Sequence, residues 1–384
     1  MTTSALTLRE LAHNAGEAMQ LDELGRSRNL AVLGGLVRPA VRGLVLKRGK
    51  AGHTSVMPTA HDTTWRWDYA RDQAELGKLT AAARRGQWDP DADLDWSTSV
   101  DPADPARPLF KPGSNVLEEL PGFLALPADR QAALTRDFLG WMLSQFMHGE
   151  QGALFVACQL TQAVGWTDGK LYGATQVMDE GRHLEVFDRY VARKLEKRYA
   201  INDYLYVMLD ALMTDPRWDI KFLGMQILVE GLALGAFTVM RQSTGEPLLS
   251  DLLKLVITDE ARHVHFGVVA LSEARAAMSD ADRRDREDWA YEMCVIMRNR
   301  FLAHEFYEEH WAHILTRQEW DRVVQETTYM RRYRDTMFRR VIPNLKRIGL
   351  LSDRVRPYYA QVGLLGWEHE KAAPDLSADE LLRA

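Results

Sequence analysis

The feature that most constrains the fold of this chain is a repeat near its middle. The pattern Asp-Glu-x-Arg-His occurs at residues 179–183 and again at 259–263. A glutamate in an apolar stretch precedes each copy by the same interval, Glu150 before the first and Glu230 before the second. All these positions recur after 80 residues (150 to 230, 180 to 260), so a unit of two helices is used twice. Two such units predict an antiparallel four-helix bundle with approximate two-fold symmetry.

The spacing inside each motif predicts that its glutamate and its histidine reach the same point. Residues three apart lie on one face of a helix, so Glu180 can act with His183, and Glu260 with His263. An ionised carboxylate in an apolar stretch is costly unless it is neutral, paired or bound to a cation. Carboxylates and imidazoles gathered in one core would repel one another without metal, and two divalent ions relieve that repulsion. Oxygen ligands with two imidazoles suit iron or manganese.

The sequence therefore predicts a dinuclear metal site inside the bundle. One glutamate from each of two helices and a Glu-x-x-His from each of the other two form the ligand set of ferritin-like di-iron proteins. The predicted metal ligands are Glu150, Glu180, His183, Glu230, Glu260 and His263. A single Glu-x-x-His is a weak signal, because a lone glutamate at such a position more often forms a surface salt bridge. The second copy, with its own upstream glutamate, makes metal binding the stronger interpretation.

Charged residues beside the predicted ligands are expected to support them. A metal-bound histidine usually donates its free N–H to a carboxylate, which fixes its tautomer. Asp179 and Asp259 adjoin the ligands, and each is expected to serve the histidine of the other repeat. Arg182 and Arg262 would then hold these aspartates in place. The simpler interpretation is ion pairing on the helix surfaces.

Apolar residues about one helical turn from the ligands are predicted to line a substrate cavity. They are Phe146, Ala153, Leu154, Phe187, Ala233, Leu234 and Phe237. Packing of the bundle core is an equally good interpretation of the same residues. No catalytic acid or base is predicted beyond the metal ligands.

Helix-breaking residues divide the chain into three zones. Residues 1–125 contain clusters of aspartate and proline, such as 89–93 and 101–105, so short helices joined by irregular segments are expected there. Residues 126–280 are predicted to form the ferritin-like bundle, and residues 281–384 to add helices that pack on it. Because no alternating apolar and polar stretch is long enough for a strand, the predicted fold class is all-α.

The helix boundaries within these zones follow from the same breakers. Inside the bundle, breaks are predicted at 165–169, 215–216 and 243–247. Beyond it, one helix is expected over 288–313 and another over 317–340, which Pro343 closes. A histidine-rich segment at 304–313 has no second copy and is more typical of a surface or an interface.

Composition and charge exclude several classes of protein. A formal net charge of -6 leaves no basic footprint for nucleic acid. Cys158 and Cys294 are isolated, which excludes a disulfide framework and a cysteine-based zinc site. Residues 1–19 lack the apolar run of a signal peptide, and the apolar stretch 30–46 is too interrupted to span a bilayer. A cytoplasmic protein without a membrane segment is therefore expected.

Two copies of Asp-Glu-x-Arg-His, each with an upstream glutamate, resemble the ferritin-like di-iron oxygenase superfamily. Its members include bacterial multicomponent monooxygenase hydroxylases, acyl-carrier-protein desaturases, ribonucleotide reductase small subunits and arylamine N-oxygenases. The motifs cover residues 140–275, and Gln87-Trp88-Asp89 with 93–96 looks like a segment that precedes the bundle in some members. The resemblance implies two Fe2+/Fe3+ ions that activate O2, and the ligand set also permits a manganese–iron pair.

At some positions this chain differs from the motifs of individual subfamilies, and these differences limit which subfamily it can resemble. Ribonucleotide reductase small subunits place a radical-forming tyrosine where this chain has Phe187, although Tyr172 and Tyr190 lie nearby in sequence. Arylamine N-oxygenases carry an additional histidine ligand where this chain has Val256. His265 cannot replace it, because two residues beyond His263 it points to the other side of the helix.

Two further subfamily roles make demands that can be checked. Ferritin-type iron storage needs only a small cage-forming bundle, and this chain is far longer. A desaturase would need a basic patch for an acidic carrier protein. Arg331, Arg332, Arg334, Arg339 and Arg340 could provide one, although a solvated helix face is the simpler interpretation.

The resulting prediction is an O2-activating di-iron oxygenase or oxidase that acts on a small or medium organic substrate. Hydroxylation, N-oxygenation and desaturation all stay open. No flavin, nicotinamide or iron–sulfur fingerprint is present, so electrons are expected from a separate reductase or ferredoxin. A homodimer is expected. The alternatives are a non-catalytic or iron-handling protein and a cofactor protein like the ribonucleotide reductase small subunit.

Overall fold

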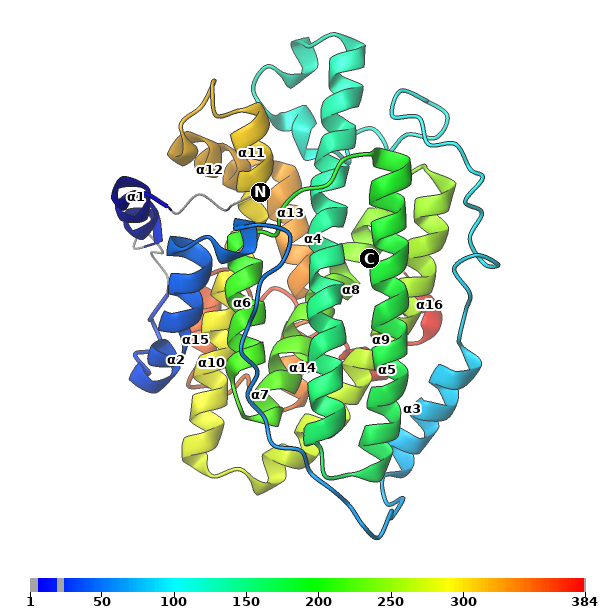
Figure 1. The fold of residues 1–384 in the computed structure, drawn as a ribbon, viewed down its shortest axis with the longest axis vertical. Coiled ribbons are helices and arrows are strands. Elements are labelled where there is room, and N and C mark those ends of the chain that lie inside the picture. The colour runs from blue at the N-terminus through cyan, green and yellow to red at the C-terminus, as the bar shows by residue number, and fades with distance from the viewer. Residues whose placement is uncertain (1–5, 19–23, 383–384) are drawn as a thin grey trace.

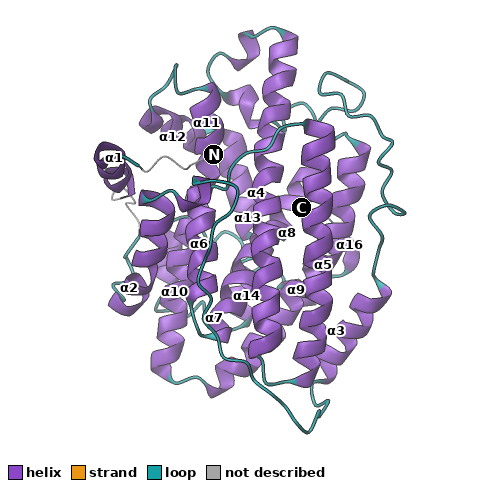
Figure 2. Cartoon of the chain, in the orientation of Figure 1, coloured by secondary structure: helices purple, strands orange, loops and turns teal. Residues whose placement is uncertain are grey.

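A computed structural model describes residues 6–18 and 24–382 of the chain. Within these two ranges the protein is helical and contains no strand, which confirms the predicted all-α class (Figure 2). The signal-peptide expectation concerns residues 1–19, of which 1–5 and 19 lie outside the described ranges.

Four long helical segments form the centre of the molecule. The first pair is α4 (Ala128–Ala163) and α5 (Thr167–Tyr190), which pack along most of their length (Figure 1). The second pair is α9 (Pro247–Ala277) and a composite helix made of α7 (Trp218–Phe222), η6 (Leu223–Val229) and α8 (Glu230–Ser243). The three helix breaks predicted for this region all occur between these elements.

The start of α9 and the shape of the composite helix both have local causes. Glu246 caps α9 by accepting hydrogen bonds from the backbone N–H groups of Leu248 and Leu249, and Pro247 occupies its first turn. The composite helix widens into a π-helical segment, η6, which ends immediately before Glu230. Such segments are rare and occur mostly at functional sites.

The remaining helices surround the bundle. They are α1 (Leu8–Ala18), α2 (Leu30–Ala40), α3 (Ala74–Arg85), α6 (Asp203–Thr214), α10 (Asp280–Asn299), α11 (His304–His310), α12 (Arg317–Glu326), α13 (Thr328–Phe338), α14 (Ile342–Arg347), α15 (Arg356–Gln361) and α16 (Ala378–Leu381). The short π and 3-10 turns are η1 (Val41–Val45), η2 (Arg48–Lys50), η3 (Val116–Glu119), η4 (Phe123–Ala125), η5 (Val191–Leu195), η7 (Arg300–Leu302) and η8 (Ala373–Asp375).

The N-terminal zone consists of short helices and long irregular segments. Much of residues 51–73 and 86–127 has no regular structure and runs over the surface of the bundle (Figure 1). Between these segments, α3 packs against α5 and α9. This contact brings the residues that directly follow α3 against the two motif-bearing helices.

The predicted helices after the bundle were too long. The segment predicted as 288–313 breaks at Ala303, whose backbone is left-handed with a φ of 49°, so α10 and α11 are separate helices. The segment predicted as 317–340 breaks at Thr327, whose side chain caps α13 by accepting from the Met330 N–H. Pro343 begins α14 and does not close a helix.

One helical segment, Trp218–Ser243, is long and apolar enough to cross a membrane by composition. In the folded chain 89% of its most apolar window is buried inside the protein. Its position at the centre of the bundle accounts for its apolar character, because a helix buried on all sides needs no polar face.

Gly235 in α8 allows α13 to approach the bundle closely. A Cβ atom at this position would lie 3.0 Å from the Cα atom and 3.1 Å from the carbonyl oxygen of Met337. Both neighbours are backbone atoms, so they cannot rotate away. The close approach therefore depends on the absence of a side chain.

We predict that Gly235→Ala destabilises the protein by about 1–3 kcal/mol, the usual cost of overpacking a close contact. Thermal unfolding monitored by circular dichroism measures the effect. The matched control is Gly34→Ala in α2, where no atom lies within 4 Å of an added Cβ. Alanine favours helix there by about 1 kcal/mol, so the control should not lower the melting temperature. Equal melting temperatures for the two variants would contradict the close packing of α13.

Candidate metal centre

The structure brings the six predicted metal ligands together in the middle of the bundle. α4 and α8 each supply one glutamate, while α5 and α9 each supply a glutamate and a histidine. All six side chains are buried, and the most exposed of them, Glu150, retains only 5% of its accessible surface. No ordinary protein core collects four carboxylates in this way without compensating charge.

These side chains form two overlapping groups of potential ligands. Within each group one nitrogen or oxygen atom per residue lies within 4.8 Å of the others. The first group is Glu150, Glu180, His183 and Glu260, and the second is Glu180, Glu230 and His263. Because the groups share Glu180, the arrangement fits a dinuclear site.

Glu180 and Glu260 lie between the two histidines. The Glu180 carboxylate is 3.5 Å from Nδ1 of His183 and 3.1 Å from Nδ1 of His263. The Glu260 carboxylate is 3.1 Å and 3.6 Å from the same two nitrogen atoms. Each carboxylate is therefore placed to act together with either histidine.

Several buried atoms at this centre lack a hydrogen-bond partner within the protein. They are Oε2 of Glu180, Nδ1 of His183, Oε2 of Glu230, both carboxylate oxygens of Glu260 and Nδ1 of His263. A buried polar atom without a partner costs free energy, and a cluster of them indicates a missing ligand. All are donor atoms that bind iron or manganese. The residues present thus fit a pair of such ions.

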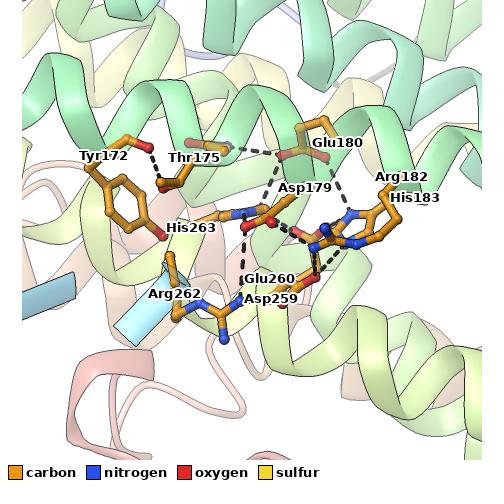
Figure 3. A network of polar contacts seen from close by, with 12 residues as sticks. Tyr172, Thr175, Asp179, Glu180, Arg182, His183, Asp259, Glu260, Arg262 and His263 are labelled. Carbon is orange, nitrogen blue, oxygen red and sulfur yellow. Dashed lines mark hydrogen bonds and ion pairs between the residues drawn. The ribbon is translucent and has the colours of Figure 1, made fainter. Parts of the chain in front are cut away.

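The opposite edge of each imidazole faces an aspartate of the other repeat. Nε2 of His183 lies 3.1 Å from Oδ2 of Asp259, and Nε2 of His263 lies 3.3 Å from Oδ2 of Asp179. Arg182 donates to both aspartates, over 2.6 Å and 3.0 Å (Figure 3). This arrangement leaves Nδ1 of both histidines directed toward the glutamates.

Three more residues hold the aspartates, and two of them were not assigned a role from the sequence. Gln87 donates to Asp179 over 2.9 Å, and Trp88 donates from its indole nitrogen to Asp259 over 2.8 Å. Arg262, which was predicted, donates to Asp259. Gln87 and Trp88 follow α3, so their position depends on tertiary packing that no local pattern reports. Their only sequence signal was the resemblance of the segment around them.

Two buried glutamines beside the centre were also missed. Gln176 donates from one amide nitrogen to Glu230 over 2.8 Å and to Glu180 over 3.0 Å. Gln226 stands behind it and donates to its amide oxygen over 3.4 Å. Each glutamine precedes a ligand glutamate by four residues, so both share its helix face. That spacing was a signal the sequence offered.

The repeat makes the two ends of the centre chemically different. The positions equivalent to Gln226 and Gln176 after the 80-residue shift are Phe146 and Val256. Phe146 packs against Phe187 and Phe237, with ring centroids 6.1 Å and 4.7 Å away. The Glu230 end is therefore lined by amides, whereas the Glu150 end is lined by an aromatic wall formed by these three phenylalanines.

The positions of the other predicted pocket residues do not distinguish a substrate cavity from ordinary core packing. Ala153 and Leu234 are buried, and Ala233 packs partly buried against the core. Leu154 is half-buried and lies outside that core, so the structure does not direct it toward the centre.

Other polar residues raised by the sequence lie away from the centre or in structural roles. Tyr190 donates to Glu246, the cap of α9. His265 lies at the surface beside Glu75, at 3.0 Å. His310 and Glu309 form a second acidic group with Asp137, but this group is partly exposed and includes ion pairs to surface cations.

The basic run proposed for a carrier protein does not form one surface. Arg339 pairs with Glu370, and Arg340 is buried and donates to the backbone of Glu380. Arg331 and Arg334 instead face a cavity on another side of α13.

Without metal, the surroundings of Glu150, Glu230 and His183 favour their protonated forms. Burial and the nearby Glu260 carboxylate raise the pKa of Glu150 well above its usual range, and burial and Glu180 do the same to the pKa of Glu230. Burial opposes the charged form of His183, yet Asp259 and the glutamates raise its pKa well above the usual value. Cations that bind here must displace these protons.

Comparison with known proteins gives this centre its family. Residues 70–349 match the family described as p-aminobenzoate N-oxygenase AurF. The chain belongs to this family. It is therefore an O2-activating oxidoreductase of the ferritin-like di-iron class, as the sequence predicted, and not a passive scaffold. The chain belongs to this family although it has Val256 where the resemblance implies an additional histidine ligand.

Two other comparisons add little to the family match. No curated protein matches the chain significantly. A solved structure of an R2-like ligand-binding oxidase, a valine-to-isoleucine mutant with an aerobically reconstituted Mn/Fe cofactor, is similar over 76% of this chain and 99% of its own. Its sequence identity is 18% and its TM-score is 0.47.

We predict that Asp259→Asn weakens metal binding by about 10–100-fold, the usual effect of removing a carboxylate that orients a ligating histidine. Titration of the metal-free protein with Fe2+ or Mn2+ measures the affinity. Glu75→Gln is the control, because Glu75 contacts His265 at the surface and no predicted metal ligand. Unchanged affinity in Asp259→Asn would mean that His183 needs no support from the other repeat.

Proposed function

We propose that this protein N-oxygenates an aromatic amine at a di-iron centre. The observation that carries the proposal is the buried cluster of four glutamates and two histidines, whose donor atoms lack partners inside the protein. The family match supplies the reaction type, because a protein of that family is described as acting on p-aminobenzoate. The aromatic wall beside Glu150 supports an aromatic substrate.

The ligand set assigns each glutamate a place. The group of Glu150, Glu180, His183 and Glu260 would hold one ion, and the group of Glu180, Glu230 and His263 would hold the other. When bound, such a pair supplies the electrons and the binding site for the reduction of O2. Iron suits these ligands, and a manganese–iron pair also does.

The protein itself contributes orientation and exclusion of water. The aspartates of the two repeats fix the histidine tautomers, so that Nδ1 of each ring stays available. Gln176 holds Glu180 and Glu230 by hydrogen bonds at the polar end. At the opposite end, Phe146, Phe187 and Phe237 offer only apolar surface. An aromatic amine would therefore approach from the Glu150 end, where no amide competes for its nitrogen.

The electron supply and the assembly state belong to the same proposal. The sequence has no flavin, nicotinamide or iron–sulfur fingerprint, which favours a separate reductase or ferredoxin as donor. A homodimer and a cytoplasmic location stay predictions from the sequence.

Elemental analysis of protein produced with iron tests the centre. We expect about two iron ions per chain, the number that this ligand pattern holds in ferritin-like proteins. Glu180→Ala and Glu260→Ala should both lose most of the metal, because each removes a carboxylate that lies within 3.6 Å of both imidazoles. His265→Ala is the control and should keep it, since His265 lies at the surface. Manganese in place of half of the iron would identify a mixed pair.

The reaction is tested with the metal-loaded protein, O2, a chemical reductant and 4-aminobenzoate. We expect oxygenated nitrogen products, identified by mass spectrometry, in the native protein and in His265→Ala only. Products oxygenated at ring carbon would replace N-oxygenation by hydroxylation. Less than about half a metal ion per chain, unchanged in the alanine variants, would overturn the di-iron centre itself.

A further inference from the structure

A narrow crevice leads away from the aromatic end of the centre. It lies between α4, α6 and α13, has a volume of about 30 Å³, and is lined mainly by aromatic side chains. Phe146 belongs both to this crevice and to the aromatic wall beside Glu150. Along α4 the crevice extends from Phe146 to Phe138, which at 1.5 Å per residue is about 12 Å.

A larger cavity adjoins the far part of the crevice. It has a volume of about 360 Å³, within the range of pockets that bind small molecules. The two cavities share Phe301 and Met330, whose side chains form the boundary between them. We call the larger cavity the basic chamber, because Arg298, Arg331 and Arg334 line it.

Among the described residues, arginines make up most of the charged lining of the basic chamber. Among the lining residues that the structure describes, Asp335 is the acidic one, and it is exposed. Burial, together with the neighbouring Arg298 and Arg331, lowers the pKa of the Arg334 guanidinium. Arg334 donates one hydrogen bond to the backbone oxygen of Gln325. A guanidinium group has five N–H donors, so Arg334 can also bind an anion.

We propose that the basic chamber binds the anionic group of an aromatic substrate before the ring enters the crevice toward Glu150. A carboxylate matches the planar fork of a guanidinium group and would relieve the repulsion among the arginines. The aromatic lining beyond Phe301 and Met330 suits the ring of the same molecule. This inference rests on the proposed function, and it adds that the enzyme selects anionic over neutral aromatic amines.

The narrow crevice between the chamber and the metal centre means that the chamber can act in substrate capture and not in the reaction itself. The crevice holds roughly the volume of one water molecule, so a ring can enter only when the side chains at the boundary move. Met330 is unbranched and flexible, which suits it to such movement. Because the crevice separates the chamber from Glu150, the arginines act on binding and leave the chemical step to the metal centre.

The test compares two probes of the same shape and different charge. Binding of 4-aminobenzoate and of the neutral 4-aminobenzamide is measured by calorimetry at low salt, on the metal-loaded native protein, Arg334→Gln and Arg331→Gln. We expect both variants to bind 4-aminobenzoate more weakly, by about tenfold or more for Arg334→Gln, the effect of losing one charged hydrogen bond. Binding of 4-aminobenzamide should be weak and unchanged.

Arg332→Gln is the matched control. Arg332 is exposed on the same helix and does not line the chamber, so this variant removes the same charge from α13 without touching the cavity. Equal losses in Arg332→Gln and Arg334→Gln, or equal losses for the two probes, would overturn the proposal. Retained melting temperatures show that the variants are folded.

The binding assay separates this inference from the proposed function. Selective binding of 4-aminobenzoate that depends on Arg334 supports the chamber even if no nitrogen is oxygenated. N-oxygenation of anionic and neutral amines with equal kcat/KM would keep the proposed reaction and overturn the chamber.

Discussion

The contact on which this structure depends is the crossed pairing of aspartates and histidines between the two repeats. Asp179 faces His263 and Asp259 faces His183, so neither two-helix unit can orient its imidazole alone. Arg182 joins both aspartates and neutralises part of their charge. The buried Asp179 and Asp259 carboxylates are tolerated because each has a charged or polar partner on the other unit. The fold of the bundle and the position of the metal ligands therefore depend on the same contacts between the two units.

The sequence predicted the parts of the structure that follow from regular spacing between nearby residues. Glutamate and histidine three residues apart define a helix face, and the 80-residue repeat places four such helices around one point. Gln87 and Trp88 escaped this reasoning because their contacts depend on how α3 packs across the bundle. Gln176 could have been found from its spacing to Glu180. The first helix after the bundle was predicted too long because its break lies at Ala303, which has a left-handed backbone. Glycine is the usual sequence signal for that conformation, and this position has none.

The repeat also explains how the two ends of the centre come to differ. Duplication alone would give two equivalent faces, yet the chain has diverged at the positions that do not bind metal. Glutamines occupy these positions around Glu230, whereas Phe146 and Val256 occupy the equivalent positions around Glu150. Amides hold carboxylates in fixed orientations and leave little room for a ligand from outside. An apolar surface makes no such bonds, and it favours the burial of an aromatic ring. The same helical framework thus provides hydrogen-bonded support at one end and an apolar surface at the other.

The distance between the proposed capture site and the metal centre depends on a helix contact that lies between them. α13 carries Arg331 and Arg334 on its chamber side, and its Met337 lies against Gly235 of α8. Glu230 begins the same helix α8. Gly235 lets the two backbones approach within van der Waals contact, so the arginines keep a fixed position relative to the glutamates. A bulkier residue would move α13 as a unit, because a helix transmits displacement along its hydrogen-bonded backbone. Selectivity for an anionic substrate and the chemistry at the metal centre would then both depend on one residue that lacks a side chain.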